Sequence, residues 1–160
     1  MRKIHLLGPM FVVMLLGCQE AVNPRVATRL NDDAAVVGDL PSNPLQEKVI
    51  TSWLDRKNGT MSTLYGNELA IQHARTSAAA DYPNGSVLSL VTWKEQEDPR
   101  WFGGRIPQRP TSVEIVTVHA APDQYTYQRF ENSPLKKVDE HVAPYDRAAY
   151  LLNQRAAVMP

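Results

Sequence analysis

Histidine is the side chain in this sequence best suited to bind a metal ion or haem iron, so histidine spacing is the first evidence about chemistry. The four histidines stand at positions 5, 73, 119 and 141, and none forms the H-x-x-x-H or H-x-E pair of common zinc sites. A single histidine can still be an axial ligand of haem iron. We expect His73 to cap or face outward from a helix, His119 to end a strand and His141 to lie in a solvated loop.

Catalysis by side chains alone has little support. The sequence contains no G-x-S-x-G, and Gly103-Gly104 is followed by Ile106-Pro107 instead of a helix that could hold a phosphate. Glu95, Glu97 and Asp98 cluster at the end of an expected strand, where a solvated turn is the ordinary interpretation. The sequence therefore favours a protein without catalytic residues, and a cofactor-free enzyme stays open as an alternative.

The segment 93–109 has the composition of a binding surface. Aromatic residues and arginines are the residue types that dominate contact hot spots. The candidates are Trp93, Trp101, Phe102 and Arg105, with Arg100 and Arg109 nearby. The alternative is that Trp101 and Phe102 fold back over one end of the sheet and leave the arginines in solvent.

Cys18 is the only cysteine, and it directly follows a segment with the features of an N-terminal export signal. Arg2 and Lys3 precede a 13-residue apolar run that ends at Leu16, whereas a membrane-spanning helix needs about 20 such residues. The sequence Leu15-Leu16-Gly17-Cys18 resembles the lipobox of bacterial lipoproteins. The resemblance implies cleavage before Cys18 and acylation, as with palmitate, which would anchor the chain to a membrane. Because Gln19 follows the cysteine instead of aspartate, it also implies sorting to the outer membrane, facing the periplasm.

The remaining chain is long enough for one domain. Removing the predicted signal peptide, residues 1–17, leaves about 140 residues. We expect a lipidated N-terminus and linker over residues 18–43, because this part is rich in turn residues, although Val36 and Val37 could dock locally. The domain then covers residues 44–160. With 17 basic and 17 acidic residues in the whole chain, no electrostatic case for nucleic-acid binding exists.

The pattern of the domain predicts an α+β fold, an antiparallel β-sheet of about three to five strands with flanking helices. Asn43 and Pro44 are expected to start a helix that buries Leu45, Val49, Ile50, Trp53 and Leu54 and stops at Asn58-Gly59. A second helix is expected from Glu68 to about Arg75, capped by Asn67, and a last one from Tyr145 to Val158. Strands are expected over residues 60–65, 86–95, 112–119 and 125–130, with a turn at 82–85.

Residues 45–130, roughly, resemble the cytochrome P-460 family. The matching residues are Tyr65-Gly66-Asn67, Tyr82-Pro83-Asn84-Gly85-Ser86-Val87-Leu88 and Trp93. The resemblance implies the fold of that family and of the related beta-type c-prime cytochromes, a mainly antiparallel sheet that carries covalently bound c-type haem. It also implies hydroxylamine oxidation or nitric oxide binding.

Covalent haem attachment in this family uses a C-x-x-C-H motif near the C-terminus, and this sequence has none. We therefore expect a relative without haem that has a non-catalytic binding or structural role in the cell envelope. The alternative is a noncovalent haem protein that handles nitric oxide or hydroxylamine, with His141 or His119 as the iron ligand. The expected partners are the membrane, through the lipid, and a protein or small molecule of unknown identity.

Overall fold

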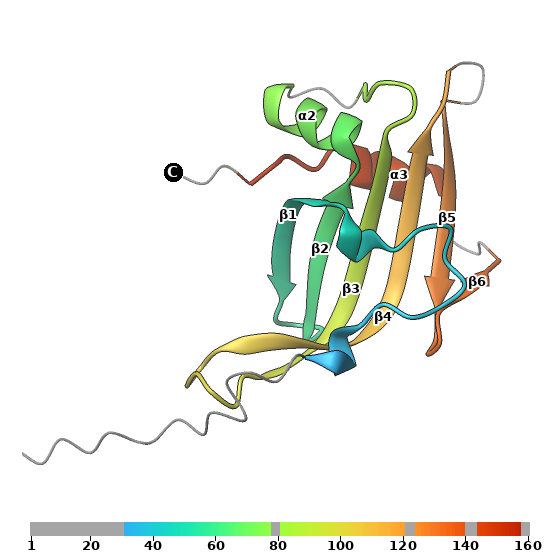
Figure 1. Ribbon diagram of the computed structural model, residues 1–160. Coiled ribbons are helices and arrows are strands. Elements are labelled where there is room, and N and C mark those ends of the chain that lie inside the picture. Colours follow the sequence, from blue (N-terminus) through green and yellow to red (C-terminus); the bar gives the residue numbers. More distant parts are fainter. Residues whose placement is uncertain (1–30, 78–80, 121–123, 140–143, 158–160) are drawn as a thin grey trace, which may run out of the picture.

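A computed structural model of the protein describes residues 31–77, 81–120, 124–139 and 144–157. In these ranges six strands form one antiparallel sheet, in which each strand pairs with the next along the chain (Figure 1). They are β1 (Lys48–Asp55), β2 (Thr60–Gly66), β3 (Val87–Glu97), β4 (Arg105–Val118), β5 (Tyr125–Glu131) and β6 (Lys136–Val138). The predicted α+β class with an antiparallel sheet is confirmed, although the sheet has more strands than expected.

The long helix predicted after Asn43 is wrong. Residues 44–55 form one 3-10 turn, η2 (Pro44–Gln46), followed by the edge strand β1. Val49 pairs with Tyr65 while Thr51 pairs with Leu64, so Ile50 is the extra residue of a β-bulge. The bulge interrupts the alternation of a regular strand, which explains why the apolar residues have helical spacing. Asn43 does act as a cap, because its side chain accepts a hydrogen bond from the backbone N–H of Leu45.

Two α-helices flank the sheet, α2 (Glu68–Thr76) and α3 (Pro144–Leu152). The predicted cap of α2 is confirmed, since Asn67 Oδ1 accepts from the Ala70 N–H at 3.0 Å. The last helix is shorter than predicted and ends at Leu152. Beyond it the chain returns to the first strand, where the Ala157 N–H donates to the Ile50 carbonyl at 2.8 Å.

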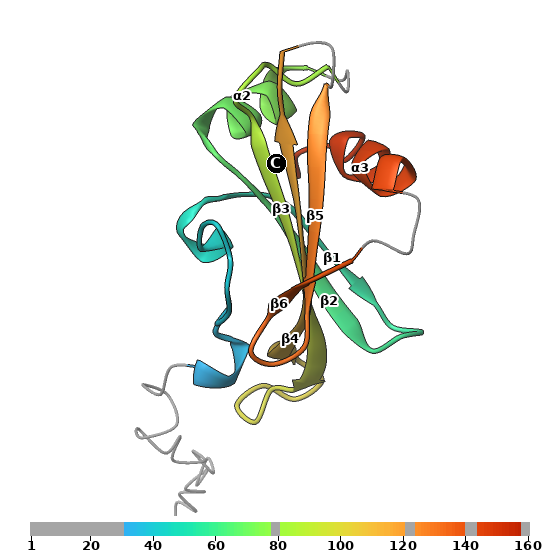
Figure 2. The ribbon, with the colours of Figure 1, turned by 90° about the vertical axis from the view of Figure 1, so that its right-hand side faces the viewer.

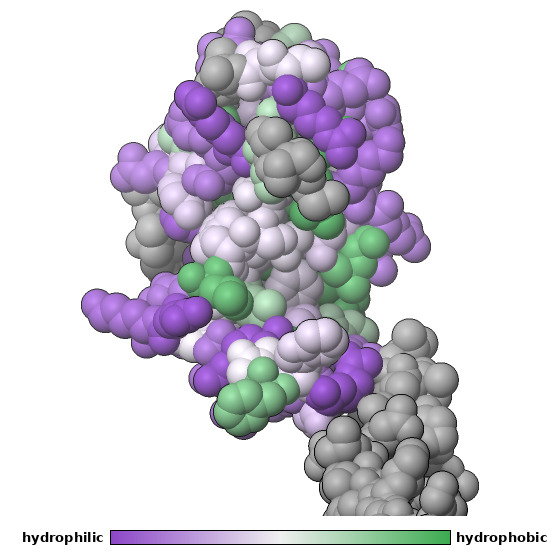
Figure 3. Space-filling model, turned by 90° about the vertical axis from the view of Figure 1, so that its left-hand side faces the viewer, coloured by the Kyte–Doolittle hydropathy of each residue, from purple (hydrophilic) through white to green (hydrophobic). Residues whose placement is uncertain are grey.

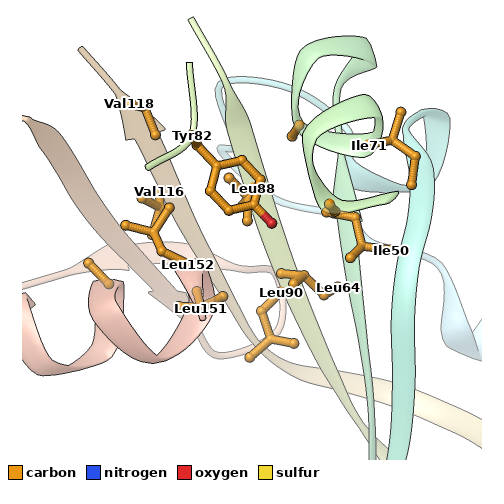
Figure 4. Packing of buried hydrophobic residues seen from close by; sticks show 13 residues of the cluster. Ile50, Leu64, Ile71, Tyr82, Leu88, Leu90, Val116, Val118, Leu151 and Leu152 are labelled. Atoms are coloured by element: carbon orange, nitrogen blue, oxygen red, sulfur yellow. The ribbon is translucent and has the colours of Figure 1, made fainter. Parts of the chain in front are cut away.

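The main core lies between α2, α3 and one face of the sheet, which we call the helix face. Apolar side chains from all layers meet there, and each is at most 8% exposed (Figure 4). The larger ones are Ile50, Leu64, Ile71, Tyr82, Leu88, Leu90, Val116, Leu151 and Leu152. Interiors packed in this way leave few voids larger than a water molecule.

The opposite face of the sheet is covered by the N-terminal segment, residues 31–46, which includes η1 (Asp32–Ala34) and η2 (Figure 2). A second core lies on this face and consists of Val91, Trp93, Val113, Ile115, Phe130 and Leu135. Val36 and Leu40 pack on the second core, and Gly38 forms a parallel bridge to Leu135. Val37 is 64% exposed, so only one of the two valines considered for docking is packed. The described part of the predicted linker thus contacts the sheet, whereas residues 18–30 lie outside the described residues.

Residues 95–111 form a two-stranded projection that we call the β3–β4 extension. The pairing of β2 with β3 ends at Lys94, and that of β5 with β4 ends at Ser112. Beyond these points β3 and β4 pair only with each other among the described strands, and they project from the end of the sheet opposite α2 (Figure 1). In the described part of the chain, no helix is long and apolar enough to cross a membrane.

Candidate functional site

Trp93, predicted as part of a binding surface, is a core residue, so this prediction is wrong. Its side chain lies in the second core beneath the N-terminal segment and is 4% exposed. The indole N–H donates to the Ala34 carbonyl at 2.9 Å, which satisfies its one polar group. Trp93 therefore attaches the N-terminal segment to the sheet.

Trp101 and Phe102 stand at the tip of the β3–β4 extension and do not fold back over the sheet. They are 75% and 104% exposed, respectively. The expectation that they cover one end of the sheet is therefore wrong, because the paired strands carry them away from it. Arg105, the fourth predicted surface residue, is exposed at the base of the same loop. Three of the four predicted binding-surface residues thus lie together at the surface.

The loop that presents these aromatics is held by hydrogen bonds. Asp98 accepts from the Arg100 backbone N–H at 2.8 Å, and the Asp98 N–H donates to the Gly104 carbonyl at 3.0 Å. Gly103 has a φ of +73°, a conformation that glycine adopts without steric cost. The backbone hydrogen bond from Arg100 lowers the pKa of Asp98, so this carboxylate is charged at neutral pH.

The three carboxylates near the loop do not form an acid–base pair. Asp98 is used by the loop, and Glu97 is exposed and lies 3.9 Å from Arg105. Glu95 differs from the expected solvated turn, because its Oε2 is buried without a hydrogen-bond partner among the described residues. A cavity of about 400 Å³ adjoins it, and Arg56 and Arg105 line that cavity. These groups resemble a partly neutralised charge cluster more than a catalytic dyad.

The two described histidines come from different elements, His73 from α2 and His119 from the end of β4. His119 is exposed directly after β4, and its Nε2 is 3.2 Å from Thr126 Oγ1. The His73 side chain is only 15% exposed and packs on the Tyr82 ring with 4.5 Å between ring centroids, so its expected surface role is wrong. His141 lies outside the described residues. No group of three or more metal-binding side chains occurs in the described ranges.

A haem would need an apolar crevice and an iron ligand that points into it. The cavity beside His119 measures about 230 Å³, below the usual range of about 300–1,000 Å³ for ligand pockets, and Asp81, Gln124 and Tyr125 line part of it. A groove of about 410 Å³ on the opposite face is lined by apolar side chains, but its candidate ligands are Met61 and Tyr65. Burial raises the pKa of Tyr65, which disfavours the phenolate that iron would require. The cavity beside His119 would therefore have to enlarge to take a haem, and the groove has no histidine in its lining.

The helix face contains a polar cluster that was not predicted from the sequence. Glu114 of β4 is 3% exposed and accepts from Arg147 Nε at 2.9 Å and from Arg147 Nη2 at 2.7 Å. It also accepts from the Tyr127 hydroxyl at 2.7 Å, and Arg129 lies 3.9 Å away. Burial and the Glu114 carboxylate raise the pKa of Tyr127 to about 12. These paired groups join α3 to the sheet, which is a structural role.

The only sequence signal for this cluster was a glutamate inside a run of apolar strand residues, Val113-Glu114-Ile115-Val116. A charged residue in such a run is buried only when it is paired. The partner, Arg147, is 33 positions away, and no local pattern relates the two.

Comparison with protein families gives a match. The model of the family described as Cytochrome P460 matches residues 44–146, from the 3-10 turn before β1 to the first turn of α3. A search of curated proteins finds no match. The matched region covers all six strands and α2, and it is more than half of the chain. The chain therefore belongs to the Cytochrome P460 family.

Proposed function

We propose that this protein is an exported lipoprotein, anchored in the outer membrane and facing the periplasm, whose Cytochrome P460 domain has a non-catalytic binding or structural role. The proposal of a non-catalytic role rests on the close packing of side chains on the helix face of the sheet. Side chains at most 8% exposed occupy the space between the sheet and both helices. A haem there would have to displace close-packed side chains, each contributing about 1.5–3 kcal/mol of burial.

The anchoring part of the proposal is supported by the order of residues at the N-terminus. Arg2 and Lys3, an apolar run and Gly17-Cys18 follow one another as in an exported lipoprotein. Acylation of the cysteine thiol and of the new amino terminus gives stable attachment, because two or more chains bind where a single chain binds only marginally.

The absence of haem is tested by expressing the full chain for export with haem supplied and recording the absorption spectrum with and without dithionite. We expect no stoichiometric Soret band. A stoichiometric band would contradict the non-catalytic assignment. His119→Ala and His141→Ala variants would then identify the ligand, because the Soret band would be lost in the variant that lacks the iron-binding histidine.

The anchor is tested independently by mass spectrometry of the mature N-terminus. We expect a chain that begins at Cys18 and carries fatty acyl groups, and a Cys18→Ser variant that is released from the membrane fraction. An unmodified Cys18 in the exported protein would refute the anchor while leaving the spectral test unaffected.

Noncovalent haem binding is the second candidate, with nitric oxide or hydroxylamine as the small molecule handled. The observation in its favour is that His119 borders a cavity together with Tyr82 and Tyr125. This cavity would have to enlarge on binding, and the hydrogen bond of His119 with Thr126 would have to break.

A further inference from the structure

We propose that the tip of the β3–β4 extension, Trp101 and Phe102, inserts into the interface of the membrane that holds the lipid on Cys18. The inference rests on the lipid anchor of the proposed function and adds a second, protein-borne contact. Its starting point is the exposure of two large aromatic side chains, 75% and 104%, at adjacent positions. Exposed large apolar groups that lie together mark interaction sites more reliably than single ones.

The loop is suited to insertion because part of its backbone hydrogen bonding is internal. The Asp98 N–H donates to the Gly104 carbonyl, and the Gly104 N–H donates to the Trp101 carbonyl at 2.9 Å. Backbone groups satisfied within the loop lose little when water is removed, whereas unpaired ones are costly to bury in lipid. Tryptophan is also the residue type enriched at the boundary between lipid headgroups and acyl chains.

The described chain begins beside this extension. Asn31 Nδ2 donates to the carbonyl of Pro107 in the extension at 2.6 Å. Pro107 is five positions from Phe102, so the two lie within about 18 Å of each other. Asn31 is 13 positions after Cys18, and such a stretch reaches at most about 47 Å. The described residue nearest in sequence to the lipid therefore lies at the end of the sheet that carries the aromatic tip, while α2 lies at the other end (Figure 1).

Charge favours a lipid interface over a strongly charged partner. Residues 95–111 contain three arginines and three acidic residues, so the extension is formally neutral. Arg100 pairs with Asp98 at 3.2 Å, and Arg105 lies 3.9 Å from Glu97. On the side of the molecule drawn in Figure 3, hydrophobic and hydrophilic residues lie next to one another. The contact should consequently depend on the aromatic side chains and only weakly on anionic lipid or salt.

The test uses the full mature protein, reconstituted in vesicles of phosphatidylethanolamine with or without phosphatidylglycerol. A Phe102→Cys variant is labelled with a nitroxide, and collisions of the label with oxygen and with a water-soluble nickel complex are measured. Leu69→Cys is the matched control, because Leu69 is a 43% exposed apolar residue of α2, at the opposite end of the sheet. We expect the label at 102 to shift from nickel to oxygen accessibility on reconstitution, with either lipid, and the label at 69 to stay accessible to nickel.

Each failure has its own readout. If the parent protein takes up label at Cys18, the thiol is not acylated, and both the anchor and the insertion are refuted. If Cys18 resists labelling but positions 102 and 69 are equally accessible to nickel, the anchor stands and the insertion is overturned. If the label at 102 is shielded only when envelope proteins are added, the tip binds a protein and the lipid proposal is also overturned.

A second measurement does not require a new cysteine. Trp101 is the exposed tryptophan, whereas Trp93 is buried and Trp53 half-buried. Tryptophan emission is compared between the protein in mild detergent and the same protein in vesicles after the detergent has been removed. We expect the emission to shift to shorter wavelength in the vesicles, and we expect a Trp101→Phe variant to lose this shift. An unchanged shift in Trp101→Phe would overturn the insertion.

Discussion

Arg147 in α3 binds Glu114 in β4 with both Nε and Nη2, at 2.9 and 2.7 Å, and this pair connects the C-terminal helix to the centre of the sheet. Glu114 is 3% exposed, and its carboxylate is enclosed by this partner and by the nearby Arg129 and Tyr127. Removing one member of a buried pair is more damaging than removing both, because the remaining charge is left without compensation.

The first prediction is therefore that Arg147→Met lowers the free energy of unfolding by about 2–3 kcal/mol, less than for a fully buried pair because the Arg147 side chain is partly exposed. The double variant Glu114→Leu/Arg147→Met should lose less free energy of unfolding than the sum of the losses in the two single variants. Urea unfolding of the four proteins in the cycle measures the coupling. Additive losses would mean that the two side chains do not depend on each other.

The second prediction concerns stability at alkaline pH. The raised pKa of Tyr127, about 12, means that folding favours the protonated phenol, which donates to Glu114. Its contribution is fully present below the unfolded-state pKa of about 10 and is lost as pH rises toward the folded-state pKa. The free energy of unfolding should consequently fall between pH 10 and 12, and Tyr127→Phe should reduce this fall. Unfolding curves at a series of pH values test it, and an equal fall in the variant would assign the effect to other groups.

The third prediction separates the two tryptophans that the sequence placed in one surface. Trp93→Phe removes the hydrogen bond to Ala34 and part of a buried side chain, so we expect a loss of about 1–2 kcal/mol and faster amide exchange over residues 34–40. Trp101→Phe in the soluble state should change stability by less than about 0.5 kcal/mol, because Trp101 is exposed. Similar losses in both variants would contradict the assigned roles.

The sequence allowed the central strands to be predicted because their apolar and β-branched residues are continuous, and Asn-Gly pairs precede β2 and β3. β2, α2, β3 and β5 lie close to their predicted ranges. The error at β1 arose because one bulged residue, Ile50, shifted the apolar spacing toward that of a helix. Val49 and Leu54, which a helix would have buried, are 51% and 46% exposed in the strand.

The limits of the site prediction have a similar physical origin. Trp93 ends a run of apolar and β-branched residues, whereas Trp101 follows Asp98-Pro99 and precedes Gly103-Gly104. The local sequence did not show that the N-terminal segment covers Trp93, because that contact joins residues far apart in the chain. The early part of β4 was not predicted because Pro107 and Pro110 cannot donate to a strand ladder. They are accommodated where the β3–β4 register is irregular, opposite Glu95 and Trp93.

The last prediction concerns the junction of β2 and α2, where Gly66 leaves no room for a side chain. A Cβ at this position would lie 2.7 Å from Ile50 Cδ1 and 2.9 Å from Ala70 Cβ. Both neighbours are buried in the helix-face core, so they have little freedom to move. We expect Gly66→Ala to lower the free energy of unfolding by about 1–3 kcal/mol.

The nearer of the two contacts can be removed separately. Ile50→Val deletes Cδ1 and alone should cost about 0.5–1.5 kcal/mol. Because it also makes room for a Cβ at position 66, Gly66→Ala should cost less in the Ile50→Val background than in the parent protein. Thermal or urea unfolding of the four proteins measures the difference. An equal cost in both backgrounds would mean that the contact with Ala70 alone limits the packing of α2 on the bulged strand.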